Sequence, residues 1–236
     1  MPLHAVLLDL DRTLFDKDSA LRSFAHAQFV EHLEAVRPLW RDEWVQQFTE
    51  LHGRLMPKPQ VYQALQAHFG LTSSLTQRLA TDFDAGFPLT AAAVPGALAL
   101  LARLRDAGLK TAIVTNGRDH FQRAKIAALG ATRLVDAIVT SGAFGVKKPD
   151  PAIFGEALRL LRTAAGDAAV VGDNPEHDLR PTRLMGLRTV HKTCSTVSAD
   201  PAADFASDSL WHIGDFLLEV RESTAAAASA RQRALR

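Results

Sequence analysis

Cysteine is almost absent from the chain, which carries Cys194 alone among its 236 residues. A single cysteine cannot close an internal disulfide, so the sequence excludes the disulfide-rich scaffolds of small secreted proteins. Long apolar runs are lacking too, since none reaches the roughly 18 residues of a membrane span. The apolar start of the chain is too short for a signal-peptide core, and it lacks a basic flank and a small-residue cleavage site. We therefore expect a cytoplasmic protein.

An excess of either charge is missing as well. Lys and Arg number 27 against 26 Asp and Glu, which leaves a formal net charge of +1. Without a basic surplus there is no electrostatic footprint for nucleic acid or an anionic membrane, so we expect neither as a partner. The 47% hydrophobic content is that of a globular protein, and the length suits one large domain or a core with an insert. The sequence leaves monomer and homodimer equally open.

Short apolar runs that end at polar residues predict the strands of a sheet. The runs cover residues 4–8, 110–115, 137–140, 168–172 and 187–190. Helical patterns separate most of them and run from Leu98, Phe121 and Ile153 to stops at Gly108, Gly130 and near Gly166. This alternation predicts an α/β fold with a parallel sheet covered by helices on both faces.

One stretch between the first two predicted strands breaks the alternation. It has no convincing strand and holds most of the aromatic residues, at helical spacing, as in Trp40, Trp44 and Phe48. We interpret it as a helical insert with an aromatic core. The alanine-rich C-terminus has no apolar stripe to dock it, so we expect a flexible tail. The predicted organisation is a sheet domain of residues 1–16 and 88–221, an insert of residues 17–87 and a tail of residues 222–236.

Two carboxylates follow the first predicted strand, in the segment Asp9-Leu10-Asp11-Arg12-Thr13. In an open parallel sheet, ligands bind at the carboxyl ends of the strands, which is where this segment lies. Two carboxylates about 4 Å apart repel by roughly 4 kcal/mol at an effective dielectric of 20. A cation or a shared proton relieves that repulsion, although a helix cap or an Asx turn explains the same residues. The motif is short enough to arise by chance and decides nothing alone.

Three further segments place suitable side chains after later strands or loops. Thr115-Asn116-Gly117 offers a hydroxyl and backbone N–H groups to a phosphate. Lys147-Lys148-Pro149 supplies a cation before a helix start, and the segment from Asp173 to Asp178 adds more acids. Carboxylates suit a hard cation, whereas a lysine and a hydroxyl suit phosphoryl oxygens. The set therefore indicates magnesium together with a phosphate group.

In order and spacing, the set resembles the four signature motifs of the haloacid dehalogenase (HAD) superfamily, over about residues 4–190. The matching positions are Asp9, Asp11 and Thr13, then Thr115, then Lys148, and finally Asp173 and Asp178. The resemblance implies a Rossmann-like core with a helical cap inserted after the first motif. It also implies a Mg²⁺-dependent phosphomonoester hydrolase acting on a small phosphorylated metabolite, such as a nucleotide, a sugar phosphate or phosphoglycolate.

The resemblance implies roles for the acidic positions. Asp9 would attack phosphorus and form an aspartyl-phosphate, while Asp11 would protonate the leaving oxygen and then activate water. Mg²⁺ would be bound by Asp9, the backbone carbonyl of Asp11 and Asp173. Asp178 would support the metal through water or orient Lys148.

It likewise implies the residues that would hold the phosphoryl group, which are Thr115, Asn116 and Lys148. We prefer Lys148 to Lys147 because it directly precedes the proline, as in the family pattern. Arg12 departs from that pattern, since it stands where relatives often have glycine.

Other functions stay open at this point. A dehalogenase of the same superfamily lacks the second aspartate of the first motif, because halide departs without a proton, so Asp11 argues against it. The first motif does not exclude a phosphomutase. A two-component receiver domain would carry its phosphoacceptor on a later strand, in a chain about half as long. A non-catalytic phosphate-binding relative would have lost a motif residue, and none is missing.

Overall fold

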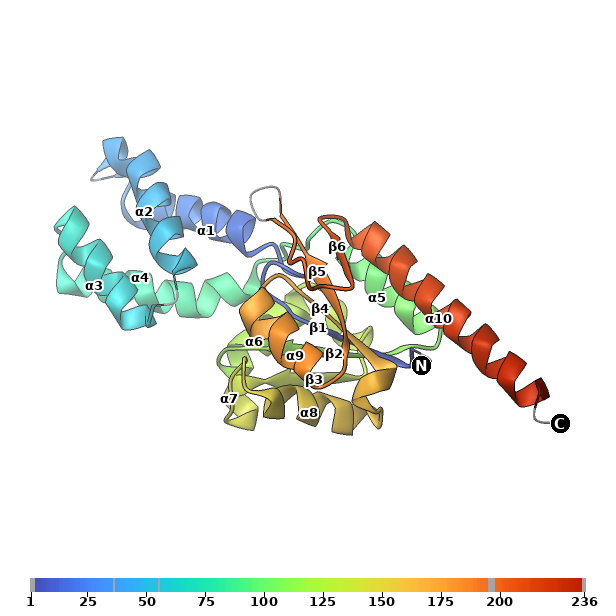
Figure 1. Ribbon diagram of the computed structural model, residues 1–236. Coiled ribbons are helices and arrows are strands. Elements are labelled where there is room, and N and C mark those ends of the chain that lie inside the picture. Colours follow the sequence, from blue (N-terminus) through green and yellow to red (C-terminus); the bar gives the residue numbers. More distant parts are fainter. Residues whose placement is uncertain (1–2, 36, 55, 195–197, 235–236) are drawn as a thin grey trace. The chain divides into compact units, whose positions relative to one another are not determined.

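The computed structural model describes residues 3–35, 37–54, 56–194 and 198–234, and a sheet of six parallel strands lies at its centre (Figure 1). The strand order is β3-β2-β1-β4-β5-β6, so the first strand of the chain lies in the middle of the sheet. The strands are β1 (Ala5–Leu8), β2 (Lys110–Thr115), β3 (Ala137–Thr140), β4 (Ala168–Gly172), β5 (Arg188–Lys192) and β6 (Phe205–Ser207).

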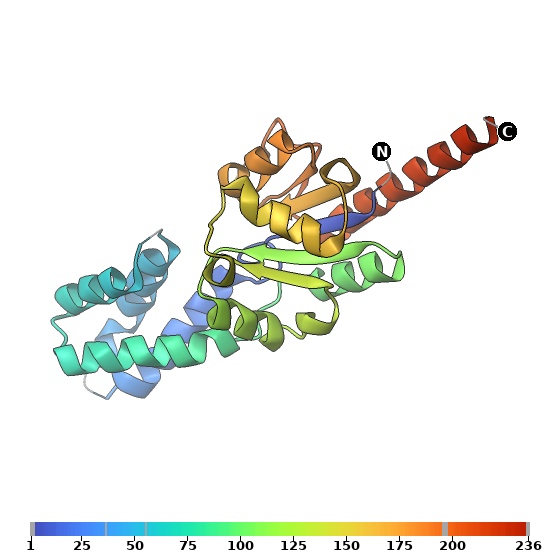
Figure 2. The same cartoon turned by 90° about the horizontal axis from the view of Figure 1, so that it is seen from below.

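Helices cover both faces of this sheet (Figure 2). Ala5 and Leu7 of β1 pack in one hydrophobic cluster with α8 (Pro151–Leu161). Successive strand residues point to opposite faces, so Val6 and Leu8 face the other side, where they are also fully buried. A strand buried on both faces is a continuous apolar run. The predicted α/β fold with a Rossmann-like core is confirmed.

The helices around the sheet begin and end where the sequence favours helix ends. α8 begins after Asp150, whose carboxylate accepts a hydrogen bond from the N–H of Ala152 at 2.9 Å, and Pro151 occupies its first turn. The other helices of the sheet domain are α5 (Ala97–Asp106), α6 (Asp119–Ala128), α7 (Ser141–Phe144), α9 (Arg180–Leu184) and α10 (Leu210–Ala234).

The C-terminal residues form a helix in the stretch where the sequence favoured a flexible tail, and the flexibility itself stays a prediction. α10 continues to Ala234, through the stretch beyond residue 222. Leu210, Ile213 and Leu217 bury the first turns of this helix. Extending an existing helix is far easier than starting one, and alanine has the highest helix propensity, so the alanine-rich stretch prolongs it.

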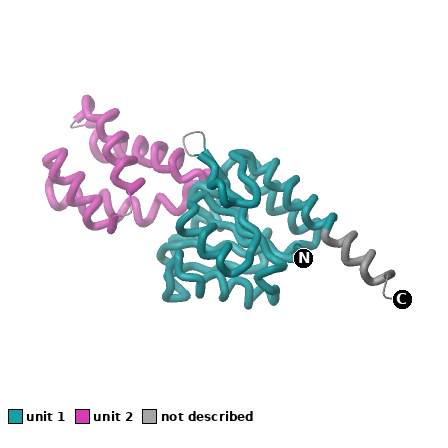
Figure 3. The backbone as a smooth tube through the Cα atoms, viewed as in Figure 1, with its two compact units in different colours: residues 1–15, 93–236 teal, residues 16–92 magenta. Residues whose placement is uncertain are grey.

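Residues 16–92 form a second compact unit, separate from the unit of residues 1–15 and 93–236 (Figure 3). Its core is aromatic, with the Phe48 ring centroid 5.9 Å from that of Trp44 and 6.0 Å from that of Phe83. The spacing of Trp40, Trp44 and Phe48 predicted a helical insert. The helices of the unit are α1 (Lys17–His32), α2 (Arg41–Gly53), α3 (Lys58–Phe69) and α4 (Ser73–Gly86).

The second unit ends later than the insert that the sequence predicted, at residue 92 rather than 87. A short 3₁₀ turn, Phe87–Leu89, follows α4. The chain then runs beside its own entry segment, where the N–H of Asp16 donates to the carbonyl of Ala92 at 2.8 Å. This hydrogen bond joins the first and the last residue of the second unit.

A buried histidine makes the helical unit sensitive to acid. His52 is 1% exposed, and its ring lies 4.0 Å from that of Phe48, whose carbonyl is 2.9 Å from Nδ1. Nε2 is buried and has no hydrogen-bond partner among the described residues. Burial, reinforced by the charge of Lys58, lowers the pKa of His52 to about 3. The folded unit therefore keeps this ring neutral where an unfolded chain would protonate it.

We predict that the protein loses stability as pH falls from about 6.5, the ordinary pKa of histidine, towards 3. Between pH 7 and pH 5, His52 alone should cost about 2 kcal/mol, because only the unfolded state takes up its proton. Urea unfolding followed by circular dichroism measures this loss. His52→Phe should remove that part of the pH dependence, whereas His26→Gln, at an exposed position of the same unit, should keep it. An unchanged pH dependence in His52→Phe would contradict the assignment.

Candidate active site

The register of the sheet brings the predicted site segments to one edge. Leu8, the last residue of β1, pairs with Ile113 of β2 and with Val171 of β4. The N–H of Asp9 continues the ladder by donating to the carbonyl of Val171 at 2.9 Å. Because all three strands are parallel, the segments that follow them, which carry Asp9, Thr115 and Asp173, leave the sheet at the same edge.

Lys148 lies at the centre of the site. Its Nζ is 2.5 Å from Oδ1 of Asp9 and 2.6 Å from Oδ1 of Asp178. All three side chains are buried, and the neighbouring Lys147 is exposed. The structure therefore joins the residues of the first, third and fourth motifs through one ammonium group, and it separates the two lysines that the sequence offered.

The carboxylates around Lys148 outnumber the positive charges. Burial raises the pKa of Asp9 to about 7 although Lys148 opposes the rise, and the charges of Asp178 and Asp173 add to it. Burial and the charge of Asp178 raise the pKa of Asp173 to about 6, against the pull of Arg12 and Lys148. Burial alone would lower the pKa of Lys148, but Asp178 and Asp9 outweigh it and hold that pKa above its usual range. The site has a deficit of positive charge.

These acids fit a hard divalent cation. Asp9, Asp173 and Asp178 each offer a carboxylate oxygen, and the three oxygens lie within 4.8 Å of one another. All-oxygen donor sets suit Mg²⁺ or Ca²⁺. Asp178 is the least available of the three, because Oδ1 accepts from Lys148 and Oδ2 accepts from the N–H of Asn174 at 3.3 Å. The donor set therefore favours Asp9 and Asp173 as ligands, with Asp178 oriented towards Lys148.

Gly172 makes room for this arrangement at the end of β4. A Cβ atom at this position would lie 2.6 Å from Cβ, Cγ and Oδ2 of Asp178, which is closer than real atoms approach. Only glycine allows the backbone to approach the carboxyl group this closely.

Asn116 fixes the loop that carries Lys148. The N–H of Lys148 donates to Oδ1 of Asn116 at 2.9 Å, and Nδ2 of Asn116 donates to the carbonyl of Lys148 at 3.0 Å. The sequence placed Asn116 at the phosphate, whereas in the structure its amide group binds the Lys148 backbone from both sides. A phosphate contact at residue 116 would come from the backbone, and it stays a prediction.

Thr115 and Asp11 are joined by two side chains of α6 that the sequence reading did not assign to the site. Nε2 of Gln122 donates to Oγ1 of Thr115 at 2.6 Å, and Nζ of Lys125 donates to Oε1 of Gln122 at 3.0 Å. Lys125 also forms an ion pair with Oδ1 of Asp11. The carboxyl group of Asp11 is thus held by its own lysine. Gln122 and Lys125 lie on the buried face of α6 beside Phe121 and Ile126. A lysine on the apolar face of a helix is the sequence feature that could have indicated this role.

The backbone of Asp173 is held by a further residue outside the motifs. His191 of β5 is fully buried, and its Nδ1 accepts from the N–H of Asp200 at 2.9 Å. Nε2 is consequently the protonated nitrogen, and it lies 3.2 Å from the carbonyl of Asp173. His191 therefore ties the loop after β4 to β5.

Arg12 lies in a backbone conformation that favours glycine, with φ of 66°. This agrees with its place in the motif, where relatives often have glycine. Its side chain is exposed, and its positive charge lowers the pKa of Asp173 against the effect of burial.

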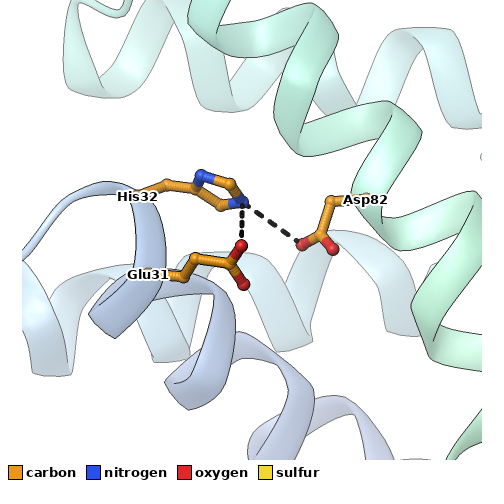
Figure 4. A group of neighbouring side chains, drawn as sticks. All are labelled: Glu31, His32 and Asp82. Carbon is orange, nitrogen blue, oxygen red and sulfur yellow. Dashed lines mark ion pairs between the residues drawn. The ribbon is translucent and has the colours of Figure 1, made fainter.

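A second group of possible metal ligands lies in the helical unit and comprises Glu31, His32 and Asp82 (Figure 4). Nε2 of His32 is 3.6 Å from Oδ2 of Asp82 and 3.9 Å from Oε1 of Glu31. Oδ2 of Asp82 also accepts from Nε2 of Gln28 at 2.8 Å. These are partly exposed surface pairs, which contribute little to stability, and we assign them no part in the site.

Comparison with known proteins assigns the chain to a family. Residues 3–186 match the family described as haloacid dehalogenase-like hydrolase. The chain belongs to this family. Among solved structures, it is similar to the HAD-hydrolase YfnB from Bacillus subtilis, a structure bound to magnesium, with a TM-score of 0.77 over 92% of this chain and 99% of that one. The two sequences are 21% identical, so this likeness shows a shared fold.

Two curated relatives of this HAD-like chain are phosphatases. It is 40% identical to the phosphoserine phosphatase of Thermus thermophilus over 46% of this chain and 44% of that protein. It is 30% identical to the glyceraldehyde 3-phosphate phosphatase of Methanopyrus kandleri over 80% of this chain and 83% of that protein. The first of these matches spans less than half of the relative's length.

Among the residues that the structure describes, no helix has the length and apolar content of a membrane span.

We predict that Lys148→Met destabilises the metal-free protein by about 3–5 kcal/mol, because it leaves buried carboxylates without their cation. Urea unfolding in excess EDTA measures the loss. The matched control is Lys147→Met at the exposed neighbour, which should change the free energy of unfolding by about 0.5 kcal/mol or less.

Adding Asp178→Asn to Lys148→Met should recover part of this stability, since it removes one of the two carboxylates that the ammonium contacts. Equal stability of the two single lysine variants would show that the Lys148 ammonium does not hold these acids together.

Proposed function

We propose that this chain is a phosphomonoester hydrolase in which Asp9 is the nucleophile and Mg²⁺ the cofactor. The observation that carries the proposal is the buried carboxylate of Asp9 at the sheet edge, 2.5 Å from the Lys148 ammonium and grouped with Asp173 and Asp178. Membership of the HAD-like hydrolases and the phosphatase relatives support it. We propose a cytoplasmic location as well.

In the first step, an oxygen of Asp9 attacks the phosphorus of the substrate. The bond from oxygen of Asp9 to phosphorus forms, and the bond from phosphorus to the leaving oxygen breaks. A carboxylate is a weak nucleophile, so the phosphoryl charge must be neutralised as attack occurs. Lys148 would supply one positive charge, and the Thr115 hydroxyl with the backbone N–H group of Asn116 would bind phosphoryl oxygens. The N–H group of Gly117 is engaged, because it donates to Oγ of Ser141 at 2.9 Å.

Mg²⁺ would be held by Asp9, Asp173 and the backbone carbonyl of Asp11, and it would supply the positive charge that the site lacks. Burial, together with the charges of the neighbouring acids, raises the pKa of Asp9 and of Asp173. A divalent cation would favour the ionised form of both acids, and Asp9 must be ionised to attack.

Asp11 would move the proton in both steps. It would donate a proton to the leaving oxygen in the first step. In the second it would take a proton from the water that attacks phosphorus and releases Asp9. Its side chain is 28% exposed, whereas that of Asp9 is 8% exposed, so it is the carboxyl group better placed to meet a leaving group or water.

The substrate class that we propose is a small phosphorylated metabolite. The two curated relatives carry the names of a phosphorylated amino acid and a phosphorylated three-carbon aldehyde. A nucleotide, a sugar phosphate and phosphoglycolate belong to the same chemical range, because each presents one phosphomonoester group. A panel of these esters, assayed with Mg²⁺ for released phosphate, tests the proposal.

A dehalogenase or a phosphomutase remains the second candidate within the superfamily. Halide leaves without a proton, so a dehalogenase needs no counterpart of Asp11. A mutase would return the phosphoryl group to a substrate hydroxyl instead of to water. Release of inorganic phosphate from simple esters separates hydrolysis from both.

We predict that excess EDTA abolishes phosphatase activity and that added Mg²⁺ restores it, because several buried carboxylates cannot stay ionised around a phosphate without a divalent cation. Full activity in EDTA would contradict the metal requirement. Asp173→Asn should mainly raise the Mg²⁺ concentration needed for half-maximal activity. If its Mg²⁺ dependence equals that of the parent protein, Asp173 is not a ligand.

We predict that Asp9→Asn leaves a folded protein with background activity, since no other group can form the acyl phosphate. Asp11→Asn should lose the general-acid contribution, about 10²–10⁴-fold, with a smaller loss on p-nitrophenyl phosphate than on an alkyl phosphate. Good leaving groups need little protonation. Rates on both esters, with intact mass spectrometry for a phosphorylated protein, measure the difference. A phosphoryl adduct on Asp9→Asn would overturn the assignment of the nucleophile.

A further inference from the structure

We infer that Lys125 is a positioning residue that fixes the carboxyl group of Asp11 and couples it to the Thr115 hydroxyl. The inference rests on the proposed function, since it assigns Lys125 a part in the reaction that Asp11 would carry out. Lys125 belongs to none of the four motifs, and its charge serves no other step of the mechanism described above.

Lys125 is buried, and its ammonium group is surrounded by one carboxylate and two aromatic rings. The side chain is 2% exposed, and its ammonium forms an ion pair with Oδ1 of Asp11. The ring centroids of Phe15 and Phe121 lie 4.6 and 5.8 Å from Nζ. Aromatic faces attract a cation and at the same time keep water from it. The ammonium is thus confined on its apolar sides and directed towards Asp11.

Gln122 connects Lys125 to Thr115, one of the predicted phosphate-binding residues. Oε1 of Gln122 accepts from Lys125 at 3.0 Å, which turns its Nε2 towards Oγ1 of Thr115 at 2.6 Å and the carbonyl of residue 116 at 3.0 Å. Because Thr115 accepts this hydrogen bond, its own O–H proton is directed to another acceptor, and a phosphoryl oxygen would serve. One turn of α6 therefore sets the orientation of both the proton carrier and the hydroxyl.

The energetics favour a role beyond packing. Burying an ammonium carries a large desolvation cost, and an apolar side chain of similar volume fills such a position without that cost. The side chain of Asp11, its partner, is 28% exposed. The ion pair is therefore buried at Lys125 and open to the site at Asp11. Holding a reacting group in one orientation removes rotational freedom before the reaction begins, and that lowers the barrier.

The test is a double-mutant cycle in the full-length chain with Mg²⁺, on p-nitrophenyl phosphate and on glycerol phosphate. Lys125→Met keeps the length and the apolar stem and removes the charge. We expect kcat on glycerol phosphate to fall about 10–100-fold with little change in KM, because a misplaced catalytic group costs up to about 100-fold. The loss on p-nitrophenyl phosphate should be several-fold smaller, since that substrate needs less help from Asp11.

In the Asp11→Asn background, Lys125→Met should cost several-fold less than in the parent, because residues that act as one unit are not additive and only the effect on Thr115 through Gln122 is left. Lys125→Arg keeps the charge and should recover at least part of the loss on glycerol phosphate. If Lys125→Met does not fold, as judged by circular dichroism, the same cycle is run with Lys125→Gln, which removes the charge and keeps a polar end. Lys147→Met, at an exposed position, is the control and should keep parental rates.

Equal losses on the two esters without accumulation of a phosphorylated protein in intact mass spectrometry, or an equal loss with and without the Asp11 carboxylate, would overturn the inference and leave Lys125 a structural residue. Absence of Mg²⁺-dependent phosphate release by the parent protein is a different result. It would overturn the proposed function, and this inference would fall with it.

Discussion

The contact between one buried ammonium and two buried carboxylates is the interaction on which the site depends. The Lys148 ammonium contacts Asp9, which directly follows β1, and Asp178, which lies in the segment after β4. Removing the Lys148 ammonium would leave both carboxylates without their cation in the protein interior, which is strongly destabilising. The surrounding structure serves this contact, because Asn116 binds the Lys148 backbone and Gly172 leaves room for the Asp178 carboxyl group. Positioning for chemistry and stability of the fold are therefore one requirement here.

Most strands of the sheet could be predicted from the sequence, because they are buried on both faces and form continuous apolar runs. β2, β3 and β4 have the predicted bounds, and β5 lies within two residues of its prediction. β6 was missed, since its three residues are only half-buried and give no apolar run. The sequence also distinguished Lys148 from Lys147, and the structure buries the former and exposes the latter.

Contacts between distant residues could not be read from the sequence in the same way. Lys125 and Asp11 are 114 residues apart, and a single lysine in a helix is ordinarily interpreted as exposed. The amide of Asn116 is a similar case, because a motif gives the residue type and not the direction in which its side chain points. The alanine-rich C-terminus shows a third limit, since helix extension depends on the turns already packed before it.

Two buried lysines divide the two acids of the first motif between them. Asp9 and Asp11 are separated by one residue, and two ionised carboxylates on so short a segment repel each other. Lys148 holds the first among the metal-ligand candidates, and Lys125 holds the second on the helix that follows β2. Each acid thus has its own cation and its own environment, the first nearly buried and the second partly open to solvent. Two carboxyl groups in unlike surroundings can take unlike roles, which is what a nucleophile and a proton carrier require of one short segment.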